Sequence, residues 1–500
     1  MVGKYRDPSV SGLRSSWLFA AVVAAYAAAQ HLWAEPSARE SLQQQLPNIV
    51  LVVVDTLRAD KLDAQRNGAP LMPLLSAFSQ RSCRFDACMA QEVWTLPSVT
   101  SLFASLYPEV HGVRYSTDPN AIWRSDRDKP TRNRVSSRIA LATAVLKKAG
   151  YSMLAVQTNP HLRTGMGLDR DFDEYKYMWA ALGETVTTEA IQLAGSAKPP
   201  YFLYCHYFDP HSVYVEHPDF FHTYGTPPLI DDQDRMAISN FVDYYIDHFY
   251  SHLRLSKDRK YAEISPAGRE HVRYLYDVEC AYVDFHVAQL IRVLDHLSNS
   301  ENIVIVTSDH GEELWDHGAL GHGKTAYREV VNVPLLIRMP GLAPSRVKDP
   351  VQLLDVMPTL FDYLQIEAPG EWQGVSVLPR PTDADRPLNG RPAFTSVGGT
   401  QAFTGLNTVC VVTDYAKLVI DKENGSEELY DVVADPEERN NLAQSSTALR
   451  DRLRSLVLAH SRENEQHPSF GIKPETVQAD QEMVQELKSL GYVGTSSAKP

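Results

Sequence analysis

The sequence has few cysteines and no long basic run, and each shortage excludes a class of protein. Its 500 residues include only the cysteines Cys83, Cys88, Cys205, Cys280 and Cys410. An odd, unevenly spaced set defines neither a disulfide framework nor a cysteine metal site, so buried thiols are expected, with Cys83 and Cys88 the one pair that could form a disulfide. Lys and Arg total 48 against 62 Asp and Glu, a net charge of −14, which argues against nucleic acid as a partner.

The N-terminus has the pattern of an export signal. Lys4, Arg6 and Arg14 precede an apolar run from Trp17 to Ala29 that ends in small residues. This run is shorter than the roughly 20 apolar residues that span a bilayer. We expect cleavage after Ala29 and a periplasmic or secreted protein, with an uncleaved membrane anchor over residues 17–33 as the alternative.

Short β-rich runs without polar alternation predict strands that are buried on both faces of a parallel sheet. Helical segments separate them, including Ile139–Ala149 and a long stretch over Tyr274–Leu297, so the order is βαβ. The predicted fold is α/β, a large and mostly parallel sheet sandwiched by helices. The predicted strands are Ile49–Val54, Met153–Val156, Phe202–Tyr207 and Ile303–Thr307.

The chain exceeds the roughly 250–300 residues at which single cores stop growing, so a second, smaller unit is expected. Short strands at Thr408–Val412 and Lys417–Ile420 and a helix near Ala448–His460 predict a small antiparallel subdomain near the C-terminus. The expected divisions are a signal or anchor with linker at 1–46, the large α/β domain at 47–395, the subdomain at 396–462, and a polar linker and tail at 463–500.

Polar side chains stand directly after each of the four predicted strands. Because the carboxyl ends of parallel strands form the ligand crevice of an open α/β sheet, these residues are expected to converge on one site. They are Asp55, then Thr158 and Asn159, then Asp209 and His211, then Asp309 and His310.

The segment from Trp94 to Leu102 predicts the start of a helix, with Pro97 in its first turn. Thr95 then lies at the positive end of that helix. A threonine there is either a plain helix N-cap or a nucleophile, and the surrounding motifs decide between them.

Five stretches match landmarks of the sulfatase family in the alkaline phosphatase superfamily, and they keep the family order. Thr95-Leu96-Pro97-Ser98 is similar to the family's nucleophile motif, which reads Cys or Ser, any residue, Pro, Ser, Arg. The stretches are 47–60, 95–112, 307–312, 355–360 and 428–442. The chain therefore resembles the sulfatases over most of its length.

The chain also departs from the family pattern. Thr95 stands where cysteine or serine would be oxidised to formylglycine, and Val99 replaces the motif arginine. Thr56 replaces a second aspartate, and Thr158-Asn159-Pro160-His161 replaces a lysine-tryptophan-histidine segment. Threonine cannot form the aldehyde, but it is the nucleophile in relatives such as nucleotide pyrophosphatases and phosphoethanolamine transferases, so the resemblance implies Thr95 in that role.

The resemblance implies a divalent metal held by Asp55, Asp309 and His310, with Thr95 as fourth ligand. Mixed carboxylate and imidazole ligation favours zinc or manganese over calcium or magnesium. His322 lies 12 positions after His310, where the threonine-dependent transferases carry a histidine. It is expected to bind a second ion or the substrate, so one or two metals remain open.

Further site roles follow from the same resemblance. His211 is similar to the histidine that touches the leaving oxygen, and Asn159 is expected either to bind a nonbridging oxygen or to cap its loop. Lys324 either neutralises an anionic substrate or lies solvated on the surface. Glu312 is expected to orient a neighbouring metal ligand.

These residues predict a hydrolase of sulfuric or phosphoric esters that forms a covalent Thr95 intermediate. Two alternatives are a phosphoryl-group transferase of the phosphoethanolamine-transferase type and a catalytically inactive binding module. The partner is an anionic ester, whose identity is expected to depend on the insert Tyr214–Arg269.

Overall fold

The computed structural model describes residues 46–113, 131–240, 263–298, 301–378, 391–398 and 407–489. The chain divides into two compact units, Met1–Leu46 and Pro47–Pro500, and every described helix and strand belongs to the second. The expected export signal or anchor lies outside the described residues. Within the described ranges, no helix is long and apolar enough to cross a membrane.

A nine-stranded sheet forms the centre of the unit, in the order β13-β4-β12-β9-β1-β8-β6-β7 with β14 beside β4. Its parallel part confirms the predicted strands: β1 (Ile49–Val54), β9 (Ile303–Thr307), β8 (Tyr201–Tyr207) and β6 (Ser152–Gln157), with β7 (Glu174–Tyr177) added at the edge. Every residue of β1, β8 and β9 is buried, which explains why these runs lack alternation.

The other side of the sheet contains the antiparallel element. β12 (Asn332–Arg338) runs antiparallel to both β9 and β4 (Cys83–Met89). β13 (Ser345–Val347) and β14 (Val351–Gln352) pair with β4 in parallel. The sheet is therefore mostly parallel, as predicted.

All five cysteines are buried and free. Cys83 and Cys88 both lie on β4, toward opposite ends of the strand, and do not form the disulfide that the sequence left open.

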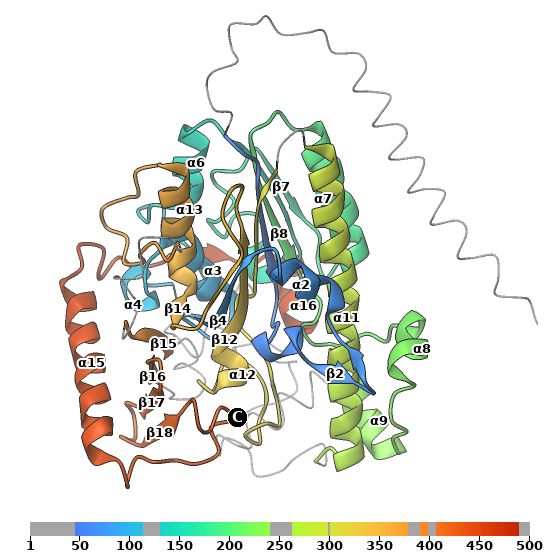
Figure 1. The fold of residues 1–500 in the computed structure, drawn as a ribbon, viewed down its shortest axis with the longest axis vertical. Helices are drawn as coiled ribbons and strands as arrows, with labels where there is room; N and C mark the ends of the chain where they lie inside the picture. The colour runs from blue at the N-terminus through green and yellow to red at the C-terminus, as the bar shows by residue number, and fades with distance from the viewer. Residues whose placement is uncertain are drawn as a thin grey trace, which may run out of the picture. The chain divides into compact units, whose positions relative to one another are not determined.

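Helices cover both faces of the sheet (Figure 1). On one side, α7 (Gly183–Ser196), α11 (Pro266–Leu297) and α2 (Pro73–Ser79) lie together. On the other side lie α3 (Thr95–Ala104), α6 (Ala142–Lys148) and α13 (Val356–Leu364), with the short α4 (Pro108–His111). α11 starts earlier than the expected Tyr274 because Ser265 caps it and Pro266 occupies its first turn.

A second sheet confirms the small antiparallel subdomain. Its strands are β15 (Ala393–Val397), β16 (Thr408–Val412), β17 (Ala416–Asp421) and β18 (Glu427–Asp431), in chain order. α15 (Thr447–Gln466) packs on it through Leu453 and Val457, which share a core with Leu418 and Leu429.

The polar linker and tail expected at 463–500 is wrong as far as residue 489. α15 continues to Gln466, β19 (Glu475–Gln478) pairs antiparallel with β5 (Thr131–Arg134), and α16 (Gln481–Ser489) follows. Some charges of this segment pair with residues far away in the chain, as Glu475 with Arg134, and Met483 and Leu487 are buried. In Figure 1 the red α16 lies back against the main body of the unit.

Candidate active site

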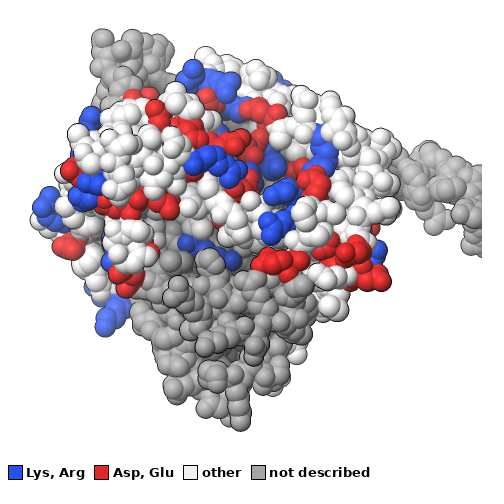
Figure 2. All heavy atoms as spheres, turned by 90° about the horizontal axis from the view of Figure 1, so that it is seen from below, with Lys and Arg blue, Asp and Glu red and all other residues white. Residues whose placement is uncertain are grey.

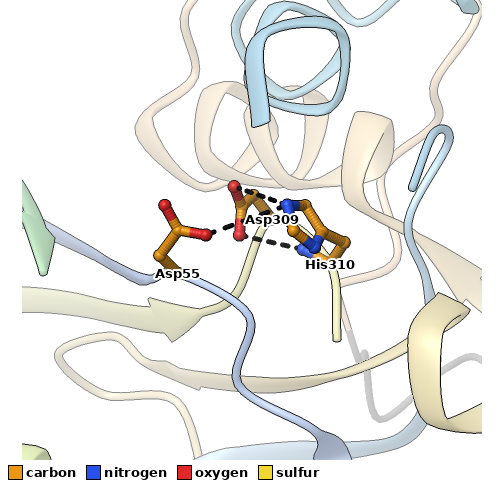
Figure 3. A group of neighbouring side chains, drawn as sticks. All are labelled: Asp55, Asp309 and His310. Atoms are coloured by element: carbon orange, nitrogen blue, oxygen red, sulfur yellow. Dashed lines mark hydrogen bonds and ion pairs between the residues drawn. The ribbon is translucent and has the colours of Figure 1, made fainter. Parts of the chain in front are cut away.

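Two neighbouring strand ends bring three metal-ligating side chains together. Asp55 follows β1, and Asp309 and His310 follow β9, which pairs with β1 in parallel. One ligand atom from each residue lies within 4.8 Å of the others, and all three side chains are buried. Figure 3 shows the Asp55 and Asp309 carboxylates and the His310 ring turned toward one another.

Each of these three residues has a polar atom without a hydrogen bond. Asp55 Oδ1, Asp309 Oδ2 and His310 Nε2 are buried and have no hydrogen bond among the described residues, although Nε2 lies 3.8 Å from the first oxygen and 3.5 Å from the second. His310 Nδ1 lies 3.0 Å from the Gly311 carbonyl, which can only accept, so Nδ1 carries the proton and Nε2 has a lone pair for a metal. Buried, unpaired ligand atoms are costly unless a cation binds them, so the set fits a divalent ion.

The two carboxylates have opposite pKa shifts. Burial and the charge of Asp55 raise the pKa of Asp309. Burial also opposes ionisation of Asp55, but the neighbouring His211, His206 and His310 rings, with the hydrogen bond from His206, outweigh it and hold the pKa of Asp55 well below its usual range. Asp55 is therefore ionised at neutral pH, and a cation would relieve its repulsion with Asp309.

Thr95 is the first residue of α3, with Trp94 at the N-cap position. Its Oγ1 accepts a hydrogen bond from Asn159 Nδ2 (3.1 Å), and the same amide group donates to Asp55 Oδ2 (2.7 Å). Ser98 Oγ donates to the Asp309 carbonyl (2.5 Å) and joins α3 to the segment after β9. Thr95 is thus not a plain N-cap and lies beside the three candidate ligands.

Asn159 caps its loop, as one of its two expected roles requires, and also contacts the candidate ligands. Its Oδ1 accepts from His161 N (2.9 Å) and caps the 3-10 helix η3 (Pro160–Leu162), while its Nδ2 donates to Thr95 and Asp55. The capping bond fixes the amide so that the donor side faces the candidate nucleophile.

His206 is a site residue that the sequence analysis missed. It lies within β8 opposite Val53 of β1, and its Nε2 donates to Asp55 Oδ2 (3.1 Å). Its Nδ1 then accepts from the Tyr204 hydroxyl (2.8 Å). The available signal was a histidine inside a fully buried strand, which needs polar partners.

His211 and His322 lie next to the candidate ligands. The His322 ring centroid is 4.4 Å from that of His310 and 5.1 Å from that of His211. His322 Nδ1 donates to Glu312 Oε1 (2.9 Å), so Glu312 orients it. Burial lowers the pKa of both His211 and His322, and the His211 Nε2 atom has no hydrogen-bond partner in the described part of the chain.

Two other residues of this loop, Lys324 and His317, are half-buried and have polar partners. Lys324 Nζ donates to the Leu320 carbonyl (2.9 Å), and burial lowers the pKa of Lys324 to about 8. The His317 ring stacks on that of Tyr327 with 3.8 Å between centroids, and its Nδ1 lies 2.7 Å from Glu329 Oε1. Figure 2, seen from below, shows lysine and arginine side chains gathered with acidic ones around a hollow.

A family model described as Sulfatase matches residues 47–366, and a second, described as N-sulphoglucosamine sulphohydrolase, C-terminal, matches residues 317–462. The uncharacterized sulfatase YidJ of Escherichia coli (strain K12) is 27% identical over 275 residues, 53% of this chain and 51% of that protein. The chain thus spans about half the length of this curated relative.

Solved structures show the same fold. A 2-O GAG sulfatase superposes with a TM-score of 0.64 at 19% identity and covers 88% of this chain and 96% of its own. The phosphonate monoester hydrolase of Agrobacterium radiobacter has a TM-score of 0.64 at 16% identity, covering 87% and 100%. Since the first family model covers well over half of the sequence, the chain belongs to the sulfatase family.

Proposed function

We propose that this protein is a metal-dependent hydrolase of sulfuric or phosphoric esters, with Thr95 as its nucleophile. The observation that carries the proposal is the cluster of unpaired ligand atoms on Asp55, Asp309 and His310, which a single asparagine links to the Thr95 hydroxyl. The sulfatase model over residues 47–366 supports the reaction class.

Asp55, Asp309, His310 and Thr95 would hold one divalent ion, with zinc or manganese favoured by the mixed oxygen and nitrogen donors. When bound, such an ion lowers the pKa of a coordinated hydroxyl and offsets negative charge that develops on the ester. His322 is the candidate for a second ion or for the substrate.

The chain's own residues then supply nucleophile and proton transfer. Asn159 Nδ2 holds Thr95 Oγ1, and the N-terminus of α3 favours negative charge there. His211 has its Nδ1 on the Ser212 carbonyl, which leaves Nε2 unprotonated. The Thr95 hydroxyl would lose its proton to solvent before the attack, because a bound ion lowers its pKa, and His211 Nε2, protonated from solvent, donates to the departing oxygen as Thr95 Oγ1 attacks sulfur or phosphorus.

Water completes the cycle by attacking the sulfur or phosphorus of the Thr95 ester, which forms the new S–O or P–O bond while the bond to Thr95 Oγ1 breaks. The attacking water gives up one proton, through His211 Nε2 or solvent, and Thr95 Oγ1 takes one up to become a hydroxyl again. A formylglycine hydrate would expel sulfate by collapsing to its aldehyde, but a threonine ester has no second hydroxyl for this. The second step therefore depends on stabilising charge at the sulfur or phosphorus centre. A divalent ion held by Asp55, Asp309 and His310 would offset that charge, and the benefit would be larger for a phosphoryl group, which carries more negative charge than a sulfuryl group.

Rates on matched nitrophenyl sulfate, phosphate and phosphodiester substrates, with the metal varied, test this proposal. We expect a phosphate mono- or diester to give a higher kcat/KM than the matching sulfate. A clear preference for sulfate with Thr95 unmodified by mass spectrometry would refute the mechanism. Transfer of the group to an alcohol rather than to water would indicate a transferase.

We also propose that the protein is exported, because basic residues precede the apolar run from Trp17 to Ala29. N-terminal sequencing of the mature protein tests this. A start at Gln30 indicates cleavage after Ala29, and an intact N-terminus in the membrane fraction indicates an anchor.

A further inference from the structure

We infer that Arg132 is a positioning residue that fixes the tautomer of His161, and with it the wall of the candidate site formed by Asn159 and η3 (Pro160–Leu162), and that the C-terminal segment 475–489 holds this wall in place. The expected effect of Arg132 on turnover rests on the proposed function, whereas the contacts that position His161 are independent of it.

The first step is the bond between Arg132 and His161. Arg132 Nη2 lies 2.8 Å from His161 Nδ1, and the residues are 6% and 1% exposed. A guanidinium group only donates, so Nδ1 must accept and the ring proton of neutral His161 lies on Nε2. Burial and the charge of Arg132 lower the pKa of His161 well below its usual range, so the ring stays neutral.

His161 belongs to the wall of the site that carries Asn159. Its backbone N–H binds Asn159 Oδ1 (2.9 Å), and its ring meets Trp94 edge-on with 5.3 Å between centroids. Trp94 directly precedes Thr95 at the start of α3. A shift of His161 would therefore move the amide that holds Thr95 Oγ1 and Asp55 Oδ2.

The C-terminal segment braces the strand that carries Arg132. β19 pairs with β5 so that Val477 lies opposite Arg132 and Glu475 opposite Arg134. The Glu475 carboxylate accepts from Arg134 Nε (3.1 Å), Ser137 N (2.7 Å) and Ser137 Oγ (2.7 Å). A four-residue strand such as β5 needs this partner to keep its place.

α16 braces the other end of the same wall. Arg163, which follows η3, lies 3.2 Å from Asp480 and 3.4 Å from both Glu482 and Glu486. The side chain of Leu487 is buried. Both supports of His161, β5 and η3, therefore depend on residues beyond the last position that either family model matches, 462.

Arg132→Ala, Arg132→Lys and the exposed control Arg138→Ala test the positioning role. In Arg132→Ala we expect kcat to fall about 10- to 100-fold, as for a displaced catalytic group, with added guanidinium ion restoring part of it. Arg132→Lys keeps a charged donor and should retain more activity, and Arg138→Ala should match wild type.

A readout without substrate separates this inference from the proposed function. Nitrogen NMR of labelled histidine, with His161 assigned by its loss in His161→Gln, should show Nδ1 unprotonated in wild type and a mixture of ring protonation states in Arg132→Ala. Wild type with protonated Nδ1 would overturn the inference, whatever the activity. Absence of turnover on every ester with the expected spectrum would overturn the proposed function alone.

Glu475→Ala tests the bracing segment in the full-length chain. We expect it to lower kcat in the same direction as Arg132→Ala, by about 3- to 10-fold, and to leave KM within about twofold, because it acts on positioning. If Arg132→Ala fails to fold by circular dichroism, Arg132→Lys and Glu475→Ala carry the test. Wild-type kcat in both of these would overturn the inference.

Discussion

Replacing Asp309 with asparagine separates metal binding from fold stability. The amide keeps the shape of the side chain, and its oxygen still accepts from His310 N (2.9 Å) and Thr56 N (3.3 Å), as Asp309 Oδ1 does. The unpaired Oδ2 becomes an NH₂ group, which cannot ligate a cation. Asp309→Asn should therefore lose the metal and turnover while the fold remains.

The size of the effect follows from linkage. A metal present at about 1,000 times its Kd stabilises the folded state by about 4 kcal/mol. Unfolding entropy of about 2.1 cal/mol/K per residue over roughly 450 residues makes this about 4 °C in Tm. Wild type should show this rise on adding metal, and Asp309→Asn should show less than about 1 °C.

Without metal, the expected order of thermal stability reverses, and Asp309→Asn should be at least as stable as wild type. Wild type then buries two carboxylates, and burial and the charge of Asp55 raise the pKa of Asp309. The variant removes one of these charges. In the presence of a chelator, the Tm of Asp309→Asn should therefore equal or exceed that of wild type.

Scanning calorimetry with and without metal, together with elemental analysis, measures both effects. Asp295→Asn is the matched control, since Asp295 bonds Arg338 (2.6 and 2.8 Å) away from the site and should keep the metal-dependent rise. An Asp309→Asn protein that retains the full rise would refute the proposed ligand set.

Three further changes test the roles assigned around the site. His322→Ala should lower kcat about 10- to 100-fold while the first metal stays bound, and loss of that metal by elemental analysis would contradict the assignment. His211→Ala should cost more on esters with poor leaving groups, so equal losses across a series of substituted phenyl esters would rule out its proton transfer to the leaving oxygen. Burial raises the pKa of Asp209 from 3.8 to about 7, so folded protein keeps a proton that unfolded protein releases between these pH values. Wild-type stability should therefore fall as pH rises through this window, and in denaturant titrations at pH 5 and pH 8 Asp209→Asn should remove roughly 2–4 kcal/mol of that fall.

The sequence predicted the buried parallel strands and much of the site that they position. β1 and β9 are apolar on both faces, so their limits are clear, and the strand-end rule grouped Asp55, Asp309 and His310. β4 was not predicted because polar residues such as Arg84 and Asp86 interrupt it near the sheet edge. β12 was not predicted either, since a proline lies inside it.

The missed site residues share a physical cause, since each depends on a contact that no local pattern carries. His206 looks like part of an apolar strand until β8 lies beside β1 and brings it to Asp55. Arg132 meets His161 29 positions away, and β5 is held by β19, more than 300 residues later. The C-terminal segment was predicted to be a polar linker because the residues that Glu475 and Asp480 contact, Arg134 and Arg163, lie more than 300 positions earlier.

Rapid quenching of turnover followed by peptide mass spectrometry tests the central claim most directly. With a nitrophenyl phosphate or sulfate, we expect a transient ester on Thr95 in wild type, no turnover in Thr95→Ala, and residual turnover in Thr95→Ser, which keeps the hydroxyl that Asn159 holds. Unmodified Thr95 throughout turnover, with Thr95→Ala as active as wild type, would contradict the account.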